Sequence, residues 1–478
     1  MRELKKHSHH VVYIIAKHDL DIREFPETVF HSYRDATYNL PPKEINSDQF
    51  PPVSGDIIDK FHCTESLVLS MMNRMFDEKC VDERKHIYYE MLRYWIGIIK
   101  KYRPEFIIFP DMPHYVYDFI IYELAHFFGI SVLIFDDTRI GGRLLFFNDL
   151  WKGSERLREE LEKNKGKKFS LEDLSEDIQK YCRPRMTEEY DKVPQYIVNQ
   201  KKKYSLWKTW VSDPKVKACI KNLTVFYKAP RYVYKLLRDR PDVRKRLFRK
   251  FYHRFTYNLP KEYQKAQSQP DFNKNFVYFA LHNQPERSTS PQGDMFVDQI
   301  LAIEMLVASL PENWVVYVKE HPMQWIREGL NFSGSRYKGY YEKLARMKNV
   351  YLVPVETNSY DLIKNAKVIA TVTGAVAWEA ALQLKPSIIF GTVWYQDCPG
   401  IFKVGDVNSC RKALEIIKNG FRADRDKLIN YLKCFDNATI RGFVSPFAGK
   451  ESGMSFDESI QNITQQILKE IQNPKHNI

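Results

Sequence analysis

The sequence predicts an α/β protein with two lobes, each built on a parallel β-sheet that helices cover on both faces. Short, continuous apolar runs alternate with helix-like stretches, which is typical of parallel strands buried on both sides. The runs fall into two groups, and a segment of different composition separates them. The chain has 478 residues, too many for one ordinary core, so its length also favours two or three domains.

The expected strands define the two lobes. The first group lies at 11–17, 106–110 and 131–135, and the second at 276–281, 314–319, 350–353, 368–372 and 387–390. We therefore expect one lobe at 1–150 and another at 270–420. Helices at 421–478 are expected to pack back on both lobes, and 151–269 is expected to be a helical, basic connector.

The positive charge of the chain is confined to part of this connector. The net charge is +13, but the eighteen Lys/Arg and three Asp of 201–254 give +15, which leaves about −2 for the rest. At 243–255, apolar residues recur every three to four positions among basic ones, which predicts an amphipathic basic helix. Such a helix either packs its apolar side on the lobes or docks on an anionic membrane, where each Lys/Arg contributes about 1 kcal/mol. Nucleic acid is not expected as a partner, because no known nucleic-acid-binding module is found.

The start of the chain shows no segment suited to a membrane. Its longest early apolar run, 11–16, has six residues, far short of the ~20 that span a bilayer. We expect a cytoplasmic protein that binds peripherally to the inner face of the cell membrane through 201–254. The seven cysteines form no C-x-x-C pair and are expected to be free thiols.

Ligands of open α/β sheets bind beyond the carboxyl ends of the strands, so functional residues are expected just after each predicted strand. The strand at 314–319 is followed by Glu320, His321 and Pro322, and ends at Lys319. Proline holds the preceding backbone extended, so His321 can project from the strand tip. An ammonium and an imidazole suit a diphosphate or phosphodiester. A structural turn remains the alternative.

The strand at 368–372 leads into a turn of small residues that contains Thr371, Thr373 and Gly374. Small residues let the backbone approach a ligand, and the N-terminus of the following helix offers free N–H groups to a phosphate. Glu379 lies further along that helix, where its carboxylate can accept hydrogen bonds from ribose hydroxyls. An ordinary tight turn with a solvated Glu379 fits equally well.

The loop after the strand at 276–281 is dense in hydrogen-bonding side chains. It includes Gln284, Glu286, Ser288, Thr289 and Ser290, and it ends where a helix begins. Because this loop lies at the carboxyl end of a strand, like the two motifs above, we expect its residues to bind substrate. A polar surface loop without function is the alternative.

Acidic residues follow two strands of the first lobe. Asp111 and His114 come after one strand, and Asp136 and Asp137 come after the next. A carboxylate or imidazole at these tips can act as the base that deprotonates an acceptor hydroxyl. The same residues fit helix caps, since Asp is a preferred N-cap.

The order of these motifs resembles a known family. The segments are FVYFALHNQPERSTSPQG, FVDQILAIEMLVASLP, YVKEHP, KNVYLVP, LIKNAKVIATVTGAVAWEAALQLKPSIIFG and VWY. In this order they resemble the capsule polysaccharide biosynthesis family, which includes the capsule Kdo transferases. The resemblance is close at 270–405 and looser at 1–150.

The resemblance implies a GT-B glycosyltransferase with two Rossmann-like lobes facing a cleft. The lobe at 1–150 would take the acceptor and the lobe at 270–420 the nucleotide sugar. In that family and in similar bacterial sialyltransferases, a His-Pro motif contacts the cytidine nucleotide phosphate, which maps onto His321 and Pro322. A Ser/Thr-rich turn also binds phosphate, which maps onto Thr371, Thr373 and Gly374.

The sialyltransferases also carry an Asp-Asp-Gly motif with the catalytic base, and here Thr138 replaces its glycine. We rank Asp137 ahead of Asp136 and Asp111 as the base, with Glu286 as the main competitor. No metal and no cofactor are expected, because GT-B enzymes stabilise the leaving phosphate with helix N-termini and basic side chains.

The expected function is transfer of a sugar, Kdo or a related acidic sugar, from a CMP-linked donor to a growing capsule or surface polysaccharide. The expected partners are the nucleotide sugar, a glycan or glycolipid acceptor, and other capsule-assembly proteins. Three alternatives stay open: a glycerophosphotransferase that uses CDP-glycerol, a nucleotide-sugar epimerase, and a non-catalytic scaffold of capsule assembly.

Overall fold

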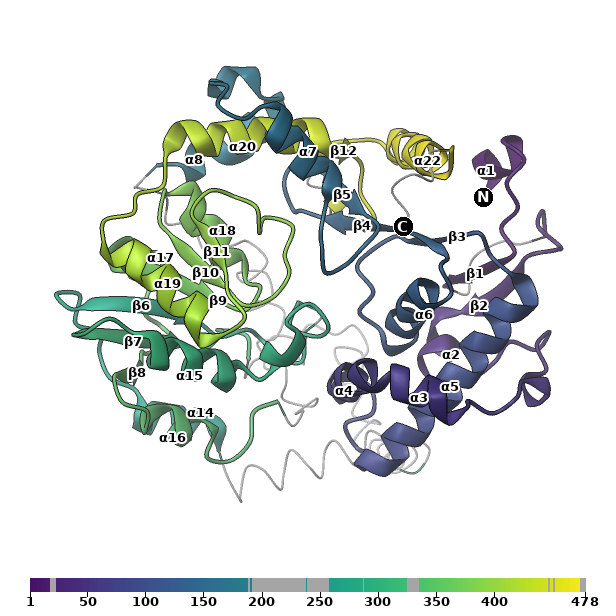
Figure 1. Cartoon of the computed structure of the whole chain (residues 1–478), viewed down its shortest axis with the longest axis horizontal. Coiled ribbons are helices and arrows are strands. Elements are labelled where there is room, and N and C mark those ends of the chain that lie inside the picture. Colours follow the sequence, from purple (N-terminus) through teal and green to yellow (C-terminus); the bar gives the residue numbers. More distant parts are fainter. Residues whose placement is uncertain are drawn as a thin grey trace, which may run out of the picture.

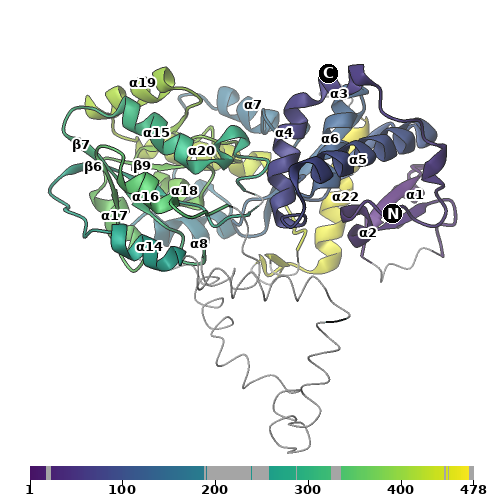
Figure 2. The ribbon, with the colours of Figure 1, turned by 90° about the horizontal axis from the view of Figure 1, so that it is seen from below.

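The computed structural model describes residues 1–17, 23–187, 190, 238, 258–286, 288–324, 335–445, 448–449 and 452–472. Two lobes lie side by side in it (Figures 1 and 2). Their strands belong to separate sheets, so the predicted two-lobed α/β class is confirmed. The predicted basic helix at 243–255 and nearly all of 201–254 lie outside the described residues.

The second lobe contains one six-stranded sheet in which every pair of strands is parallel. Its strands are β6 (Asn275–Ala280), β7 (Trp314–Lys319), β8 (Val350–Leu352), β9 (Val368–Thr371), β10 (Ser387–Ile389) and β11 (Ile401–Lys403). The spatial order β8-β7-β6-β9-β10-β11 is the 3-2-1-4-5-6 order of doubly wound sheets. The winding direction reverses between β6 and β9. All of these strands except β11 were predicted from the sequence.

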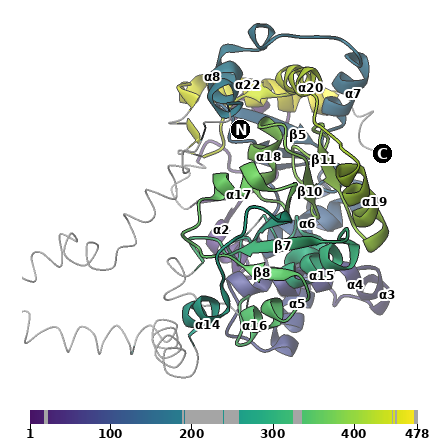
Figure 3. The ribbon, with the colours of Figure 1, turned by 90° about the vertical axis from the view of Figure 1, so that its left-hand side faces the viewer.

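Helices cover both faces of this sheet, as Figure 3 shows with the second lobe toward the viewer. Val277 and Phe279 of β6 pack in one core with Ile303 and Leu414, whereas Tyr278 packs on the opposite face with residues such as Ile363. Successive strand residues point to opposite faces, which explains why the buried strands are continuous apolar runs. The first face is covered by α14 (Leu259–Ala266), α15 (Gln299–Ser309), α16 (Tyr340–Ala345) and α19 (Val407–Lys418), and the second by α17 (Ser359–Asn365) and α18 (Ala375–Leu382).

The main sheet of the first lobe is mixed, which differs from the predicted parallel arrangement. Its order is β12 (Ile440–Arg441), β5 (Arg143–Phe147), β4 (Ser131–Asp137) and β3 (Phe106–Phe109), and only β3 and β4 are parallel. The chain reverses after β4 through Gly141 and Gly142, which have positive φ angles of 53° and 72°. Glycine adopts such angles without steric cost, so a tight hairpin replaces the expected crossover. A separate parallel pair is formed by β1 (Tyr13–Ala16) and β2 (Val29–Ser32).

Helices also sandwich the mixed sheet. One face packs on α4 (His62–Met71), α5 (Val81–Tyr102) and α6 (Val116–Phe127), and the other on α1 (Arg2–Lys6) and α22 (Phe456–Gln472). Shorter elements are α2 (Tyr33–Thr37), α3 (Gly55–Lys60), η1 (Ser47–Gln49) and η2 (Met72–Arg74). Among the described residues, no helix is both long and apolar enough to cross a membrane. The six described cysteines are free, as predicted.

Elements from three parts of the chain join the lobes. They are α7 (Glu155–Lys163), η3 (Leu171–Asp173) with α8 (Glu176–Arg185), and α20 (Arg425–Ala438) (Figure 1). Their apolar side chains share one core with Leu145 of the first lobe and Trp378 of the second. The turn η4 (Asp294–Val297), in the segment that follows β6, contacts α4, so this end of β6 faces the first lobe. The domain boundaries near 150, 270 and 420 stay a prediction.

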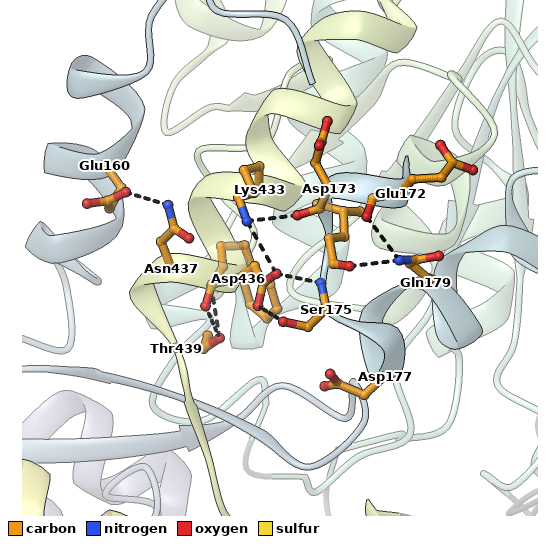
Figure 4. A network of polar contacts seen from close by, with 12 residues as sticks. Glu160, Glu172, Asp173, Ser175, Asp177, Gln179, Lys433, Asp436, Asn437 and Thr439 are labelled. Carbon is orange, nitrogen blue, oxygen red and sulfur yellow. Dashed lines mark hydrogen bonds and ion pairs between the residues drawn. The ribbon is translucent and has the colours of Figure 1, made fainter. Parts of the chain in front are cut away.

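A buried polar network holds this junction together. Arg143 of β5 donates from Nε and Nη2 to Asp177 of α8, at 2.6 and 2.8 Å, and its Nη1 lies 3.0 Å from a carboxylate oxygen of Asp436 in α20. Asp436 also accepts hydrogen bonds from the backbone N–H and the hydroxyl of Ser175, at 2.7 and 2.8 Å (Figure 4). Burial raises the pKa of Asp177, but the hydrogen bond and the charge of Arg143, together with smaller effects that include the Arg441 charge, lower it, and the pKa lies below its ordinary value. The network thus joins three elements through one guanidinium.

Replacing Arg143 with methionine is expected to lower the free energy of unfolding by about 3–5 kcal/mol, because the buried Asp436 and the half-buried Asp177 lose their counter-charge. Urea unfolding at pH 7 measures the change. The control is Arg183→Met on α8, where Arg183 forms an exposed ion pair with Glu172, and such pairs contribute about 0–1 kcal/mol. Equal losses in both variants would show that the buried network has no special role.

Candidate functional site

The ends of β6 and β9 meet at the point where the winding of the second sheet reverses. His282 follows β6, and its Nε2 lies 3.0 Å from the Oγ1 of Thr371, the last residue of β9. The same Nε2 accepts a hydrogen bond from the backbone N–H of Thr373, also at 3.0 Å. One imidazole therefore fixes the turn between β9 and α18, at the place where doubly wound sheets bind ligands.

His282 acts in this arrangement as a neutral acceptor. Its pKa is lowered to about 3, first by burial and then by the nearby charges of His321 and Arg336. Because a backbone N–H donates to Nε2, that nitrogen carries no proton and the ring proton lies on Nδ1. His282 was not among the residues predicted to bind substrate, although it directly follows a predicted strand.

The N-terminus of α18 is shaped by Gly374. A Cβ at this position would lie 2.7 Å from Thr371 Oγ1 and 3.3 Å from His282 Cε1, so a larger residue would disturb the turn. Within the described residues, this N-cap position makes no side-chain cap hydrogen bond, and Ala375 in the first turn is exposed. The first backbone N–H groups of such a helix can therefore bind an anion.

A buried ion pair connects the ends of β6 and β7. Arg336 donates to both carboxylate oxygens of Glu320, at 2.8 and 3.3 Å, and also to the backbone oxygen of His282, at 3.0 Å, and to the side chain of Gln284, at 2.6 Å. Tyr341 donates to Glu320 at 2.6 Å, and the backbone N–H of His321 does so at 2.7 Å. Glu320, predicted to bind substrate, is thus fully buried and serves as an internal counter-ion. No sequence motif marked Arg336.

The His-Pro motif remains partly accessible beside this pair. His321 Nδ1 accepts the backbone N–H of Met323 at 3.2 Å, so the proton of a neutral His321 ring lies on Nε2. His321 and Pro322 are half-buried. The ammonium of Lys319, by contrast, donates to the backbone oxygen of Thr357 at 2.5 Å and to the hydroxyl of Ser359 at 2.8 Å. Thr357 lies just before α17, and Ser359 is the first residue of that helix.

The polar loop after β6 is largely packed inside the protein. Besides its contact with Arg336, Gln284 donates to the backbone oxygen of Val297 at 2.8 Å. The hydroxyl of Thr289 donates to the backbone oxygen of Glu286 at 3.1 Å, and that of Thr373 donates to the backbone oxygen of Ser288. Two further groups in the loop, Ser290 Oγ and Asn283 Oδ1, are buried without a hydrogen-bond partner in the described part of the chain.

Glu379, in the second turn of α18, has an unusual acidity. Burial raises its pKa to about 7, although the Arg185 charge and a hydrogen bond with Tyr360 act in the opposite direction. The carboxyl is therefore about half protonated at neutral pH. The alternative stated in the sequence analysis, a tight turn with a fully solvated Glu379, therefore does not fit this side chain.

The two adjacent acids of the first lobe lie within β4, not after it as the sequence suggested. Asp136 pairs with Leu145 and Asp137 with Leu144 in the antiparallel ladder, and paired residues point to the same face. Leu145 belongs to the core at the lobe junction together with Trp378 of the second lobe, whereas Leu144 belongs to the core covered by α22. The face of Asp136 is therefore directed to the second lobe. Asp137 instead accepts the backbone N–H of Arg139 at 3.0 Å.

The other first-lobe candidates lie in the turn before α6. The carboxylate of Asp111 accepts the backbone N–H of Met112 at 2.9 Å, and Nδ1 of His114 donates to the backbone oxygen of Met112 at 2.6 Å. Both side chains thus contact the backbone of their own turn, but neither caps α6, whose N-cap is Tyr115 and has no side-chain cap hydrogen bond in the described part of the chain. Asp118 in α6 was not predicted, and burial raises its pKa well above the ordinary value.

The predicted residues thus separate into groups. Thr371, Thr373, Gly374 and Ser288 gather around His282, and Glu320 and Gln284 are joined through Arg336. Lys319 donates instead to Thr357 and Ser359, and the acids and histidine of the first lobe lie apart from both groups: Asp111, His114, Asp136 and Asp137. Within the described ranges, no three His, Cys, Asp or Glu side chains are grouped to hold a metal ion.

Glu379→Gln is expected to change how stability depends on pH. The pKa of Glu379 is higher in the folded than in the unfolded protein, so its contribution to folding stability falls as pH rises from about 4.5 to 7. His282 has the opposite effect, since its lowered pKa makes stability rise with pH between about 3 and 6.5. Urea unfolding of parent and variant at pH 5, 6 and 7 isolates the Glu379 contribution as their difference. A difference that does not change with pH would contradict the raised pKa.

Comparison with known proteins identifies the family. The model of the family described as capsule polysaccharide biosynthesis protein matches residues 189–433, just over half of the chain. This match extends beyond both ends of the region 270–405, which contains the motifs that resemble the family. A search of curated protein sequences finds no match.

Solved structures with some likeness come from several enzymes. A KpsC β-Kdo 2,7-transferase from Thermosulfurimonas dismutans is 12% identical with a TM-score of 0.24, over 49% of this chain and 67% of that one. A UDP-GlcNAc 2-epimerase from Methanocaldococcus jannaschii is 14% identical with a TM-score of 0.26, over 73% and 78%. The wall teichoic acid polymerase TagF is 14% identical with a TM-score of 0.22, over 44% and 47%. TM-scores this low do not establish a shared activity. The family match is sufficient on its own, and the chain belongs to the capsule polysaccharide biosynthesis family.

Proposed function

We propose that this protein is a glycosyltransferase that moves a sugar from a nucleotide-activated donor to a capsule or other surface glycan. The observation that carries the proposal is the assembly of His282, Thr371, Thr373 and Gly374 where the sheet reverses its winding. The N-cap of α18 is Gly374, and in the described part of the chain it makes no side-chain cap hydrogen bond to the first turn. Family membership supplies the biological setting.

In this proposal the second lobe binds the donor nucleotide. The phosphate lies at the N-terminus of α18, and His321 donates to it from Nε2. Glu379, further along the same helix, accepts hydrogen bonds from the ribose hydroxyls. Its raised pKa indicates a site shielded from water, in which such bonds are strong. A CMP-linked acidic sugar, Kdo or a relative, is the favoured donor.

The first lobe supplies the base in this proposal. An acceptor hydroxyl is too weakly acidic to attack unaided, and a positioned carboxylate typically contributes about 10²–10⁴ in rate. Asp136 is favoured over Asp137, because its strand face is directed to the second lobe. Glu286 is half-buried in the loop after β6 and remains the competitor from the donor side.

A thermal-shift panel of CMP, CDP, UDP and GDP separates the proposal from its rivals. A ligand at 100 times its dissociation constant stabilises a protein by about 2.7 kcal/mol, which is easily seen. CMP is expected to give the largest shift. A larger shift with CDP, together with turnover of CDP-glycerol, would indicate a glycerophosphotransferase. A larger shift with UDP would indicate a donor site like that of a nucleotide-sugar epimerase. No shift with any of the four nucleotides would indicate a non-catalytic scaffold.

His321→Ala is expected to weaken binding of CMP by about 1.5–3 kcal/mol, the range for a hydrogen bond to a charged group. Isothermal titration measures the affinity. The control is His86→Ala. His86 lies on α5 of the first lobe, and its side chain and that of its neighbour Glu90 are both exposed, so this change is not expected to affect CMP binding. If His321→Ala bound CMP as tightly as the control, the motif would be a structural turn.

Asp136→Asn is expected to lower turnover by 100-fold or more, in line with removal of a general base, while nucleotide affinity is preserved. Asp137→Asn is the matched control, because it carries the same chemical change on the opposite face of β4. Asp111→Asn and Glu286→Gln complete the set. Turnover and CMP affinity are measured separately for each. If Asp136→Asn stays active and Glu286→Gln does not, the base comes from the donor lobe.

A further inference from the structure

A polar cavity lies away from the switch point, where the first lobe meets the C-terminal segment. Its volume is about 420 Å³, within the range of about 300–1,000 Å³ typical of small-molecule sites. The lining residues come from β5, the residue before α8, the residue after α20, β12 and α22: Arg143, Ser175, Thr439, Ile440, Arg441, Asn462, Gln465, Gln466 and Lys469. Figure 4 shows Ser175 and Thr439 on either side of Asp436.

The lining differs from that of an ordinary ligand pocket. Such pockets are mostly hydrophobic and aromatic, but here Ile440 is the only apolar residue among those that line the cavity. The described residues of the lining include no aromatic side chain on which a nucleotide base could stack. Hydroxyl and amide groups predominate instead, and these both donate and accept hydrogen bonds. The cavity therefore suits a ligand rich in hydroxyl groups.

The charges of the lining are all positive. Arg143 is neutralised by Asp177 and Asp436. Arg441 and Lys469 are exposed, and neither side chain forms a hydrogen bond or ion pair within the described residues, although Asp177 attracts the Arg441 charge at longer range. Two cations thus remain available, and the lining residues that the structure describes include no acidic side chain. The positive charges of Arg441 and Lys469 would both attract a ligand that carries carboxylate or phosphate groups.

Most amides of the lining are on α22. Asn462 donates to the backbone oxygen of Arg441 at 3.0 Å and Gln466 to Glu470 at 2.7 Å, which fixes both side chains. Gln465, by contrast, is exposed and has no partner in the described part of the chain. The helix therefore offers a free amide between two fixed ones, next to Lys469.

From these features we propose that the cavity binds an acidic saccharide, with its hydroxyls on the amides and its negative groups on Arg441 and Lys469. One short helix connects it with the second lobe. Ser175 of the lining precedes α8, and Arg185 at the end of α8 acts on Glu379. Ten helical residues span about 15 Å. A chain of a few sugars could therefore extend from the second lobe to this cavity, which is a separate subsite. Binding of a saccharide there does not depend on which nucleotide the second lobe binds.

The test uses tetragalacturonic acid as the acidic probe, maltotetraose as the neutral one and inorganic phosphate as the free anion, each titrated into the full chain by calorimetry. The parent is expected to bind tetragalacturonic acid, more weakly as salt is added, and to bind the other two at least tenfold more weakly. The double variant Arg441→Gln/Lys469→Gln is expected to lose tenfold or more in affinity for tetragalacturonic acid. Lys412→Gln/Lys418→Gln on the exposed side of α19 removes the same charge elsewhere and is expected to bind like the parent.

A second variant tests the cavity without changing charge. Gln465→Trp places a bulky ring at its exposed rim and is expected to weaken binding of tetragalacturonic acid tenfold or more. Equal binding of maltotetraose or phosphate, unchanged binding in either cavity variant, or equal loss in the α19 variant would overturn the inference. CMP titrated in parallel distinguishes the two proposals. If the parent binds CMP but not tetragalacturonic acid, only this inference fails, and if it binds the saccharide but no nucleotide, only the proposed function fails.

Discussion

The buried pair of Arg336 and Glu320 is the interaction on which the second lobe's site depends. A guanidinium has five N–H donors, and Arg336 satisfies them with Glu320, the His282 and Ser335 backbone oxygens and Gln284. Burial lowers the pKa of Arg336, but Glu320 together with Tyr340 and Tyr341 outweighs this effect, so the pKa of Arg336 is raised. Because a buried charge without its partner is strongly destabilising, the ends of β6 and β7 are held at a fixed separation.

The same pair influences the protonation of the switch point. The Arg336 charge helps to keep His282 neutral, and only a neutral His282 can accept the N–H of Thr373. The turn before α18 is therefore fixed before any ligand arrives. Binding groups that are already in place need not be reorganised when charge develops on a leaving phosphate, which makes electrostatic stabilisation effective.

The two lobes are connected through a small number of polar and apolar contacts with separate roles. Arg143 joins β5, α8 and α20 through the half-buried Asp177 and the buried Asp436, while Leu145 and Trp378 contribute to a shared apolar core. Helix α8 begins at this network and ends at Arg185, which acts on Glu379. The junction that holds the lobes together thus also sets the surroundings of the proposed ribose-binding carboxyl.

The sequence by itself determined the α/β class, five of the six strands of the second sheet and the His-Pro and Thr-x-Thr-Gly motifs, because buried parallel strands are continuous apolar runs and ligand motifs follow their ends. Only the tertiary structure decided the mixed sheet of the first lobe, since a glycine hairpin reverses the chain after β4. It also decided which of Asp136 and Asp137 is directed to the second lobe, which depends on the pairing with β5. Arg336 could not be found from the sequence, because its role comes from partners that distant segments bring to one buried point.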